Sequence, residues 1–283
     1  MKVYSRFKRV PAIGSIELTE RDKEILRLVH RHRFLRSSNV VSLLGGSEQQ
    51  ISRRLKLLYH HGYLERPRSQ LNYFHTGGSR RMVYGLGNKA ATVLKLDVRA
   101  GEKNQSAGRI FMNHALLVSD IMVAIELACR RNSQVKLIYD EELKILAKWK
   151  VKVDGMRLSA IPDRIFALEY GNGKRVHFFL EADRGTMPAI RKNFSQTSFY
   201  RKLIAYAATW TQNLHRSHLG IDRFRVLTVT TNAKRIRSLA DACGKLRNGH
   251  RLFLFTDKSI LTSDVLSHRW RSGKVGEIAT LLD

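Results

Sequence analysis

Two apolar runs joined by a short turn restrict the fold of this chain more than any other feature. The run "LSAIPDRIFALEY" precedes the turn "GNGK", and "RVHFFLEADRG" follows it. Because successive side chains of a strand point to opposite faces, the second run has one apolar face and one face that ends in acids. The apolar face contains Val176, Phe178, Leu180 and Ala182, and the other contains Phe179, Glu181 and Asp183. This pattern predicts an antiparallel hairpin and therefore a sheet.

Helical and strand-like segments alternate around this hairpin. We expect helices at 114–130, 197–213 and 232–244. Further strands are expected at "QVKLIYDEEL", "RFRVLTVTT" and "RLFLFTD". The order helix–strand–strand–strand–helix–strand–helix–strand predicts a domain built around a mixed sheet.

The N-terminal part of the chain follows a different pattern, with three short helices before two strand-like runs. Thr19 is predicted to cap the first helix, Gly45-Gly46 to end the second, and Ser47 to cap the third, "EQQISRRLKLLYHHGYL". The strand-like runs are "YLERPR" and "RRMVYGLG". Three helices and a basic two-stranded ribbon are typical of a winged helix-turn-helix. The expected fold class is therefore α+β or α/β, with a winged helix-turn-helix followed by a mixed-sheet domain.

The charge of the chain indicates a polyanionic partner. Lys and Arg number 51 against 24 Asp and Glu, which gives a formal net charge of +27 and a pI near 10.6. Nucleic acid is the expected partner, and an anionic membrane surface is the alternative. No apolar run reaches the roughly 18 residues that span a bilayer, and Cys129 and Cys243 lack metal-site spacing. We therefore expect a cytoplasmic protein that does not enter a membrane.

The third predicted helix carries side chains suited to reading DNA bases. Its apolar positions face the core, which leaves an outward set of Gln49, Gln50, Ser52, Arg53, Arg54 and Lys56. Gln pairs with adenine and Arg with guanine through two hydrogen bonds each, so this helix is expected to enter the major groove. Arg66, Arg68, Arg80 and Arg81 are expected on the ribbon, near phosphates or the minor groove. The alternative is that these residues form an ordinary solvated basic surface.

Three carboxylates are expected to meet where the hairpin strands have their acidic ends. Asp163 directly follows Pro162, and Glu181 and Asp183 end the second strand. If the strands pair with their acidic ends level, the three side chains converge. Carboxylate oxygens suit Mg²⁺ or Mn²⁺, and such an ion polarises a phosphodiester and activates a nucleophile. The residues therefore favour a metal site with Asp163, Glu181 and Asp183 as ligands.

The proline–aspartate pair on one hairpin strand and the acidic end of the next resemble the restriction-endonuclease-type PD-(D/E)xK fold. Over roughly residues 18–245 the chain also resembles the replication-relaxation proteins of plasmids and integrative elements, which include or adjoin MobC-type relaxases. The matching stretches are "LTERDKEILRLVHRHRFL", "RRLKLLYHHGYLER", "VYGLGNKA", "NHALLVSDIMVAI", "PDRIFAL", "FFLEADRGT", "RKLIAYAATW" and "FRVLTVTT". The resemblance implies recognition of double-stranded DNA at an origin-like site of a mobile element, followed by nicking or relaxation with a divalent metal.

Composition and turn-forming residues, together with the resemblance, divide the chain. We expect a basic N-terminal arm at 1–17, a winged helix-turn-helix at 18–97, a linker at 98–109 and a nuclease-like domain at 110–283. The oligomeric state stays open, with a homodimer as one alternative.

One position departs from the nuclease pattern. Two residues after Glu181, where the pattern has lysine, the chain has Asp183. Lys202 of the following helix is expected to replace that lysine, which gives a catalytic set of Asp163, Glu181, Asp183 and Lys202, with Arg184 behind it.

Other interpretations of the acids stay open. His114 and Glu126 are further candidates for the same site. The domain is alternatively a nuclease fold that has lost its chemistry, in a DNA-binding accessory protein or transcriptional regulator. In a third interpretation, Arg164 and Arg184 neutralise the acids in a structural network.

Overall fold

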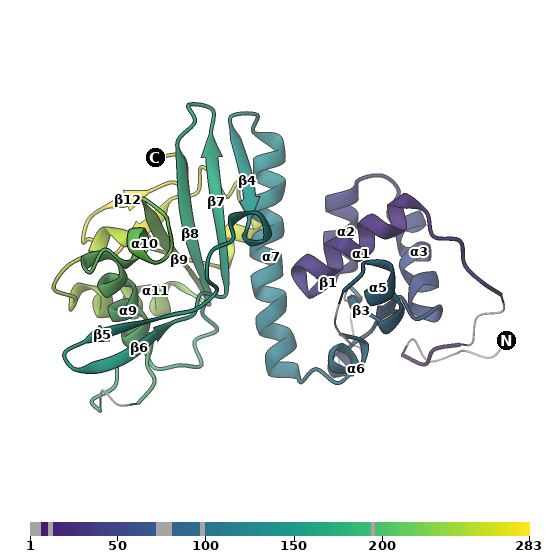
Figure 1. Ribbon diagram of the computed structural model, residues 1–283, viewed down its shortest axis with the longest axis horizontal. Helices are drawn as coiled ribbons and strands as arrows, with labels where there is room; N and C mark the ends of the chain where they lie inside the picture. Colours follow the sequence, from purple (N-terminus) through teal and green to yellow (C-terminus); the bar gives the residue numbers. More distant parts are fainter. Residues whose placement is uncertain (1–6, 11–13, 72–80, 97–99, 194–195) are drawn as a thin grey trace. The chain divides into compact units, whose positions relative to one another are not determined.

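The computed structural model describes residues 7–10, 14–71, 81–96, 100–193 and 196–283. It divides into two compact units, Met1–Val123 and Ala124–Asp283 (Figure 1). The boundary falls within helix α7 (Arg109–Arg131). By length and composition α7 is apolar enough to cross a membrane, but 56% of its apolar window is buried inside the protein.

Three helices of the first unit begin at the residues that the sequence predicts, and the second also ends where it predicts. Helix α1 (Glu20–His32) starts with a capping box, in which Thr19 and Asp22 each accept a hydrogen bond from the other's backbone N–H. Helix α2 (Ser37–Leu44) ends at Gly45, whose φ of +68° favours glycine. Ser47 caps helix α3 (Glu48–His60). The predicted caps are confirmed.

A small antiparallel sheet accompanies these helices. Its strands lie in the order β1-β3-β2, with bounds Phe34–Arg36 (β1), Val83–Leu86 (β3) and Leu64–Glu65 (β2). Strands β2 and β3 fall in the two predicted runs, whereas β1 is not predicted from the sequence. Among the described residues, the other helices before α7 are η1 (Arg68–Gln70), α5 (Asn88–Val93) and α6 (Ala100–Gln105). Helix α6 occupies part of the segment 98–109, which is predicted as a linker.

Within the described residues, the second unit is built on a seven-stranded mixed sheet. Its strands in spatial order are β12 (Ile278–Ala279), β11 (Trp270–Ser272), β10 (Phe253–Asp257), β9 (Phe224–Thr230), β8 (Arg175–Ala182), β7 (Arg164–Tyr170) and β4 (Val135–Tyr139). The pairs β8–β9 and β9–β10 are parallel, and the other neighbours are antiparallel. The predicted mixed sheet and the β7–β8 hairpin are confirmed.

One predicted strand is in fact two. The run "LSAIPDRIFALEY" breaks at Pro162, because proline has no N–H for the ladder. Strand β6 (Met156–Ala160) lies before the break and pairs with β5 (Trp149–Val153) in a separate hairpin. The two residues of its turn, Asp154 and Gly155, have φ values of +47° and +77°, as tight hairpin turns require.

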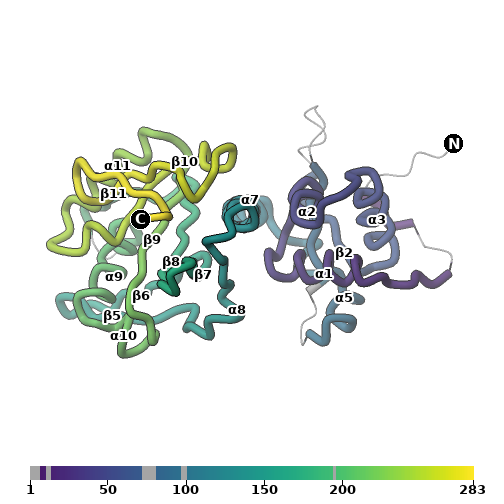
Figure 2. The backbone as a smooth tube through the Cα atoms, turned by 90° about the horizontal axis from the view of Figure 1, so that it is seen from above, coloured from purple at the N-terminus to yellow at the C-terminus, as the bar shows by residue number. Residues whose placement is uncertain are grey.

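Two helices and the β5–β6 hairpin share one core with the large sheet. Helices α9 (Phe199–Thr211) and α11 (Ala233–Gly244) pack in a buried cluster with Trp149, Phe179 and Phe253. Figures 1 and 2 both show the β5–β6 hairpin beside α9. The short connecting helices are α8 (Asp140–Leu143), α10 (Leu214–Ser217), η2 (His250–Leu252) and η3 (Lys258–Thr262).

Candidate functional site

The acidic end of the β7–β8 hairpin forms the first candidate site. The register pairs Arg164 with Leu180, so Asp163 and Glu181 come next along the two strands. The backbone N–H of Asp163 donates to the carbonyl of Leu180 at 2.9 Å, and Oδ2 of Asp163 accepts from the N–H of Ala182 at 2.8 Å. The acidic ends of the two strands therefore lie level, as the sequence predicts.

Glu181 is buried and receives hydrogen bonds from two side chains of α9. Nζ of Lys202 donates to Oε2 at 2.5 Å, and the hydroxyl of Tyr206 donates to Oε1 at 2.6 Å. Lys202 and Tyr206 are four residues apart, so one face of the helix presents both. Burial raises the pKa of Glu181 to about 7, although the charge of Lys202 acts in the opposite direction.

Lys202 experiences the charge of all three predicted carboxylates. Burial alone would lower its pKa, but the negative charges of Glu181, Asp163 and Asp183 raise that pKa above its ordinary value. The Lys202 side chain is 32% exposed, whereas that of Glu181 is 2% exposed. The ammonium therefore contacts a buried carboxylate and solvent at once. The three predicted carboxylates therefore all act on this one ammonium, and Glu181 bonds to it directly.

Asp183 is paired with a different cation. Arg235 of α11 donates from Nε to Oδ2 at 2.8 Å and from Nη2 to Oδ1 at 3.2 Å. Oγ1 of Thr230 donates to the same Oδ2 at 2.7 Å. Nη2 of Arg235 also donates to the carbonyl of Met187 at 2.6 Å. Asp183 therefore joins β8 to β9 and α11.

The three carboxylates do not fit one shared metal ion as they lie. Among the residues that the structure describes, no three His, Cys, Asp or Glu side chains could hold one ion. Both oxygens of Glu181 and of Asp183 accept hydrogen bonds, and two of the donors are the cations Lys202 and Arg235. A dication would have to displace them. The arrangement therefore does not correspond to the predicted Mg²⁺ or Mn²⁺ site of Asp163, Glu181 and Asp183.

The outer face of α3 forms the second candidate site. Of the predicted outward set, Gln49, Gln50, Ser52, Arg53 and Lys56 are exposed, as are Glu48 and Leu57 of the same helix. Arg54 departs from the prediction, because Nε and Nη2 donate to the two oxygens of Asp22 at 2.6 and 2.5 Å. Asp22 is fully buried. Arg54 therefore attaches α3 to α1 and does not belong to the outward set.

The predicted ribbon arginines lie in different environments. Arg66 is 7% exposed, its guanidinium lies 4.2 Å from the centre of the Tyr59 ring, and Nη2 donates to the hydroxyl of Tyr84. The aromatic faces attract the Arg66 cation into the core. The prediction that Arg66 lies near DNA phosphates is therefore wrong. Arg68 and Arg81 are exposed, and Arg81 pairs with Glu48 of α3. Arg80 lies outside the described residues.

A comparison with models of known protein families assigns the chain to a family. The model of the family described as replication-relaxation matches residues 26–222, which include α3, the β7–β8 hairpin and Lys202. The chain belongs to the replication-relaxation family. Membership confirms the resemblance seen in the sequence and supports DNA interaction in plasmid or mobile-element replication or relaxation. No curated protein and no solved structure gives a significant match to the chain.

In this replication-relaxation protein, two residues that bond to the acidic cluster are not predicted from the sequence: Tyr206, which bonds to Glu181, and Arg235, which bonds to Asp183. Tyr206 follows Lys202 by four residues on a predicted helix, so helical spacing is a usable signal for it. Arg235 has no such signal, because it lies on another helix and is distant from Asp183 in the sequence. Its role depends on the tertiary fold.

Other sequence candidates have separate partners. Arg164, which one interpretation pairs with the acidic cluster, donates to Asp140 at 3.0 Å. Glu126 is buried and accepts a hydrogen bond from the hydroxyl of Tyr139. His114 lies in the first unit.

Proposed function

We propose that this replication-relaxation protein binds double-stranded DNA at a specific site of a plasmid or mobile element, in the cytoplasm, as a DNA-binding accessory or regulatory protein. The observation that carries the proposal is the exposed face of α3. It combines amide donors and acceptors, a hydroxyl and two cations, at Gln49, Gln50, Ser52, Arg53 and Lys56. These groups suit base edges and phosphates together.

The order of elements in the first unit supports α3 as the recognition helix. The order α1, β1, α2, α3, β2, β3 is that of a winged helix-turn-helix, in which the third helix enters the major groove. Arg81, which precedes β3, pairs with Glu48 in the first turn of α3. This pair places a ribbon cation beside the start of the helix, where it would contact DNA backbone.

The order of elements and the acidic cluster of the second unit support its descent from a nuclease-like domain. Apart from α8, α10 and the separate β5–β6 hairpin, the chain from α7 to β9 follows the helix–strand–strand–strand–helix–strand order that the sequence pattern predicts, with the acids at the end of the β7–β8 hairpin as in the PD-(D/E)xK resemblance. The hydrogen-bonded state of Glu181 and Asp183 supports a unit that has exchanged metal binding for internal ion pairs.

Base readout by α3 is tested with DNA selected from a random duplex pool. Arg53→Ala and Gln50→Ala are expected to reduce the preference for selected over scrambled duplex by about 1–3 kcal/mol each, with a smaller loss of total binding. Fluorescence anisotropy at fixed salt measures both affinities. Arg27→Ala, an exposed arginine of α1, is the matched control and should keep the preference. If selection enriches no sequence, or both α3 variants discriminate like the control, the proposal is wrong.

Metal-dependent nicking is a second candidate, favoured by the position of Lys202. This lysine reaches Glu181 from α9, although the nuclease pattern places its lysine at position 183. In a nicking reaction its part-exposed ammonium would stabilise negative charge on the scissile phosphate. Glu181 and Asp163 would hold the ion, which would supply the activated nucleophile.

A further inference from the structure

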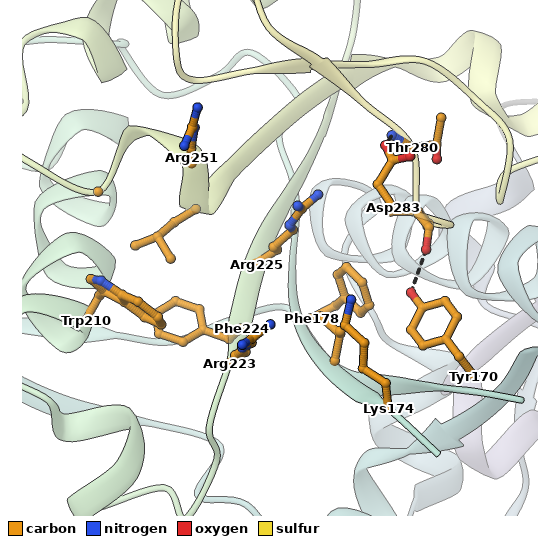
Figure 3. Close-up of a pocket in the computed structure, with 14 residues that line it drawn as sticks. Tyr170, Lys174, Phe178, Trp210, Arg223, Phe224, Arg225, Arg251, Thr280 and Asp283 are labelled. Atoms are coloured by element: carbon orange, nitrogen blue, oxygen red, sulfur yellow. Dashed lines mark hydrogen bonds between the residues drawn. The ribbon is translucent and has the colours of Figure 1, made fainter. Parts of the chain in front are cut away.

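A hollow at the opposite end of strand β8 from Glu181 is lined by cations and aromatic rings. It has a volume of about 270 Å³ and lies wholly in the second unit. We call it the basic–aromatic pocket and define it by Tyr170, Lys174, Trp210, Arg223, Arg225 and Arg251 (Figure 3). Lys174 precedes the first residue of β8, whereas Glu181 is near its last, so about 20 Å of strand separates the two sites.

Three of these cations have no acidic partner in the part of the chain that the structure describes. Among the described residues, no carboxylate lies within ion-pair distance of Lys174, Arg223 or Arg225, whereas Arg251 is paired with Glu277. Figure 3 shows the four cations around the same hollow. Like charges gathered around one hollow repel each other, and an anion placed among them removes that cost. One acid, Asp283, also lines the pocket, and its side chain accepts a hydrogen bond from the N–H of Thr280.

Trp210 provides an aromatic surface beside these cations. Its ring stacks on His215, with centroids 4.5 Å apart and planes 13° from parallel, and meets the edge of Phe224 at 5.9 Å. These contacts hold the ring in place, yet Trp210 remains 38% exposed. A fixed, part-exposed tryptophan next to unpaired cations is the combination that binds single-stranded nucleic acid, through base stacking and phosphate contact.

We propose that the basic–aromatic pocket binds one nucleotide of single-stranded DNA, with a phosphate among Lys174, Arg223 and Arg225 and a base against Trp210. The volume of about 270 Å³ lies just below the range of about 300–1,000 Å³ that is typical of small-ligand sites, so the pocket holds one nucleotide at most and excludes a duplex. The inference is independent of the proposed function, since it concerns another unit and another form of DNA.

Tryptophan emission of the full chain provides the test. Trp149 and Trp270 are buried, so quenching by a short oligothymidylate reports on Trp210. Quenching is expected, and the double variant Arg223→Gln/Arg225→Gln should raise Kd for the oligothymidylate about tenfold. The slope of log Kd against log salt should fall by about 0.7 for each phosphate that the variant no longer neutralises. The control Lys234→Gln/Arg237→Gln removes the same charge from exposed positions of α11. It should change Kd and the salt slope much less than the pocket variant does.

Further measurements distinguish binding of a nucleotide from binding of phosphate alone or of duplex DNA. Thymidine monophosphate should compete for the quenched site, and inorganic phosphate should compete much less, because it lacks a base. Duplex affinity should be equal in the two double variants, whereas Arg53→Ala should leave quenching unchanged. The proposal is overturned if the oligothymidylate fails to bind or binds without quenching. An equal rise of Kd in both double variants, or equal competition by phosphate and nucleotide, would overturn it as well.

Discussion

At the scale of single residues, Glu181 shows how a buried carboxylate alters stability. Its side chain is 2% exposed, and the two donors of α9 compensate only in part for the loss of water. Burial raises its pKa from 4.5 to about 7. The folded protein therefore holds the proton more tightly than the unfolded chain. The stabilising contribution of Glu181 is complete below about pH 4.5 and is lost as the pH rises through about 7.

Glu181→Gln should remove this pH dependence. The unfolding free energy of the wild type minus that of the variant is expected to decrease between pH 4.5 and about 7 and to level off above. The decrease should be at most about 3 kcal/mol, since each pKa unit corresponds to about 1.36 kcal/mol. Urea titrations across this range measure it.

Glu169→Gln is the control for the pH experiment. A hydrogen bond from Arg175 lowers the pKa of the part-exposed Glu169, so its contribution is present above its ordinary pKa and is lost as the pH falls. Its difference curve should not decrease as the pH rises. Parallel curves for the two variants would mean that the environment of Glu181 is not the one described.

At the scale of elements, α3 contains two neighbouring arginines with different tasks. Arg53 is exposed, whereas Arg54 forms two hydrogen bonds to the buried Asp22 in the first turn of α1. Asp22 also closes the capping box with Thr19. A single ion pair therefore connects the cap of one helix to the middle of another.

Arg54→Gln should destabilise the protein by about 2–3 kcal/mol, because it leaves the carboxylate of Asp22 buried without its cation. The value is below the usual range for fully buried pairs, since the Arg54 side chain is 30% exposed. Arg53→Gln should change stability by less than about 0.5 kcal/mol. Chemical denaturation followed by circular dichroism compares the two. Equal effects would show that the pair with Asp22 does not hold α3 to α1.

The sequence predicts helix ends well because they depend on local chemistry. The caps at Thr19 and Ser47 follow from side chains that bond to nearby N–H groups. The β5–β6 hairpin also has a local signal, since alternate apolar residues from Trp149 precede the Asp154–Gly155 turn. Strand β1 has too few residues for a periodic signal, and the buried Phe34 acquires its meaning only from the strand that pairs with it.

Partners that cross between elements are not predictable in this way. The sequence places acids at the end of β8 correctly, but it does not show that Arg235 bonds to Asp183. Arg66 and the exposed Arg68 lie in the same basic stretch of the sequence, yet contacts with two tyrosine rings hold Arg66 in the core. Which arginine faces DNA and which faces protein depends on the packing of whole elements.

At the scale of the whole molecule, the net charge of +27 opposes the binding of any free cation and favours polyanions. DNA changes this balance, because its phosphates neutralise the surface and concentrate divalent ions around the complex. A divalent metal that does not bind the free protein would therefore bind more readily in the DNA complex. Any test of a metal at the acidic cluster has to include both states.

We predict that Mn²⁺ leaves the melting temperature of the free protein unchanged and produces no shift in the DNA complex that depends on Glu181. Lys202 and Tyr206 already bond both oxygens of Glu181, so an ion would have to displace a cation before it gained a ligand. Preferential binding to the folded state would raise the melting temperature, which scanning calorimetry measures. Supercoiled plasmid carrying the element's own origin, incubated with the protein and Mn²⁺, should stay supercoiled. A Mn²⁺-dependent rise that Glu181→Gln abolishes, together with open-circular plasmid from the wild type alone, would establish nicking as the function and exclude a purely DNA-binding role.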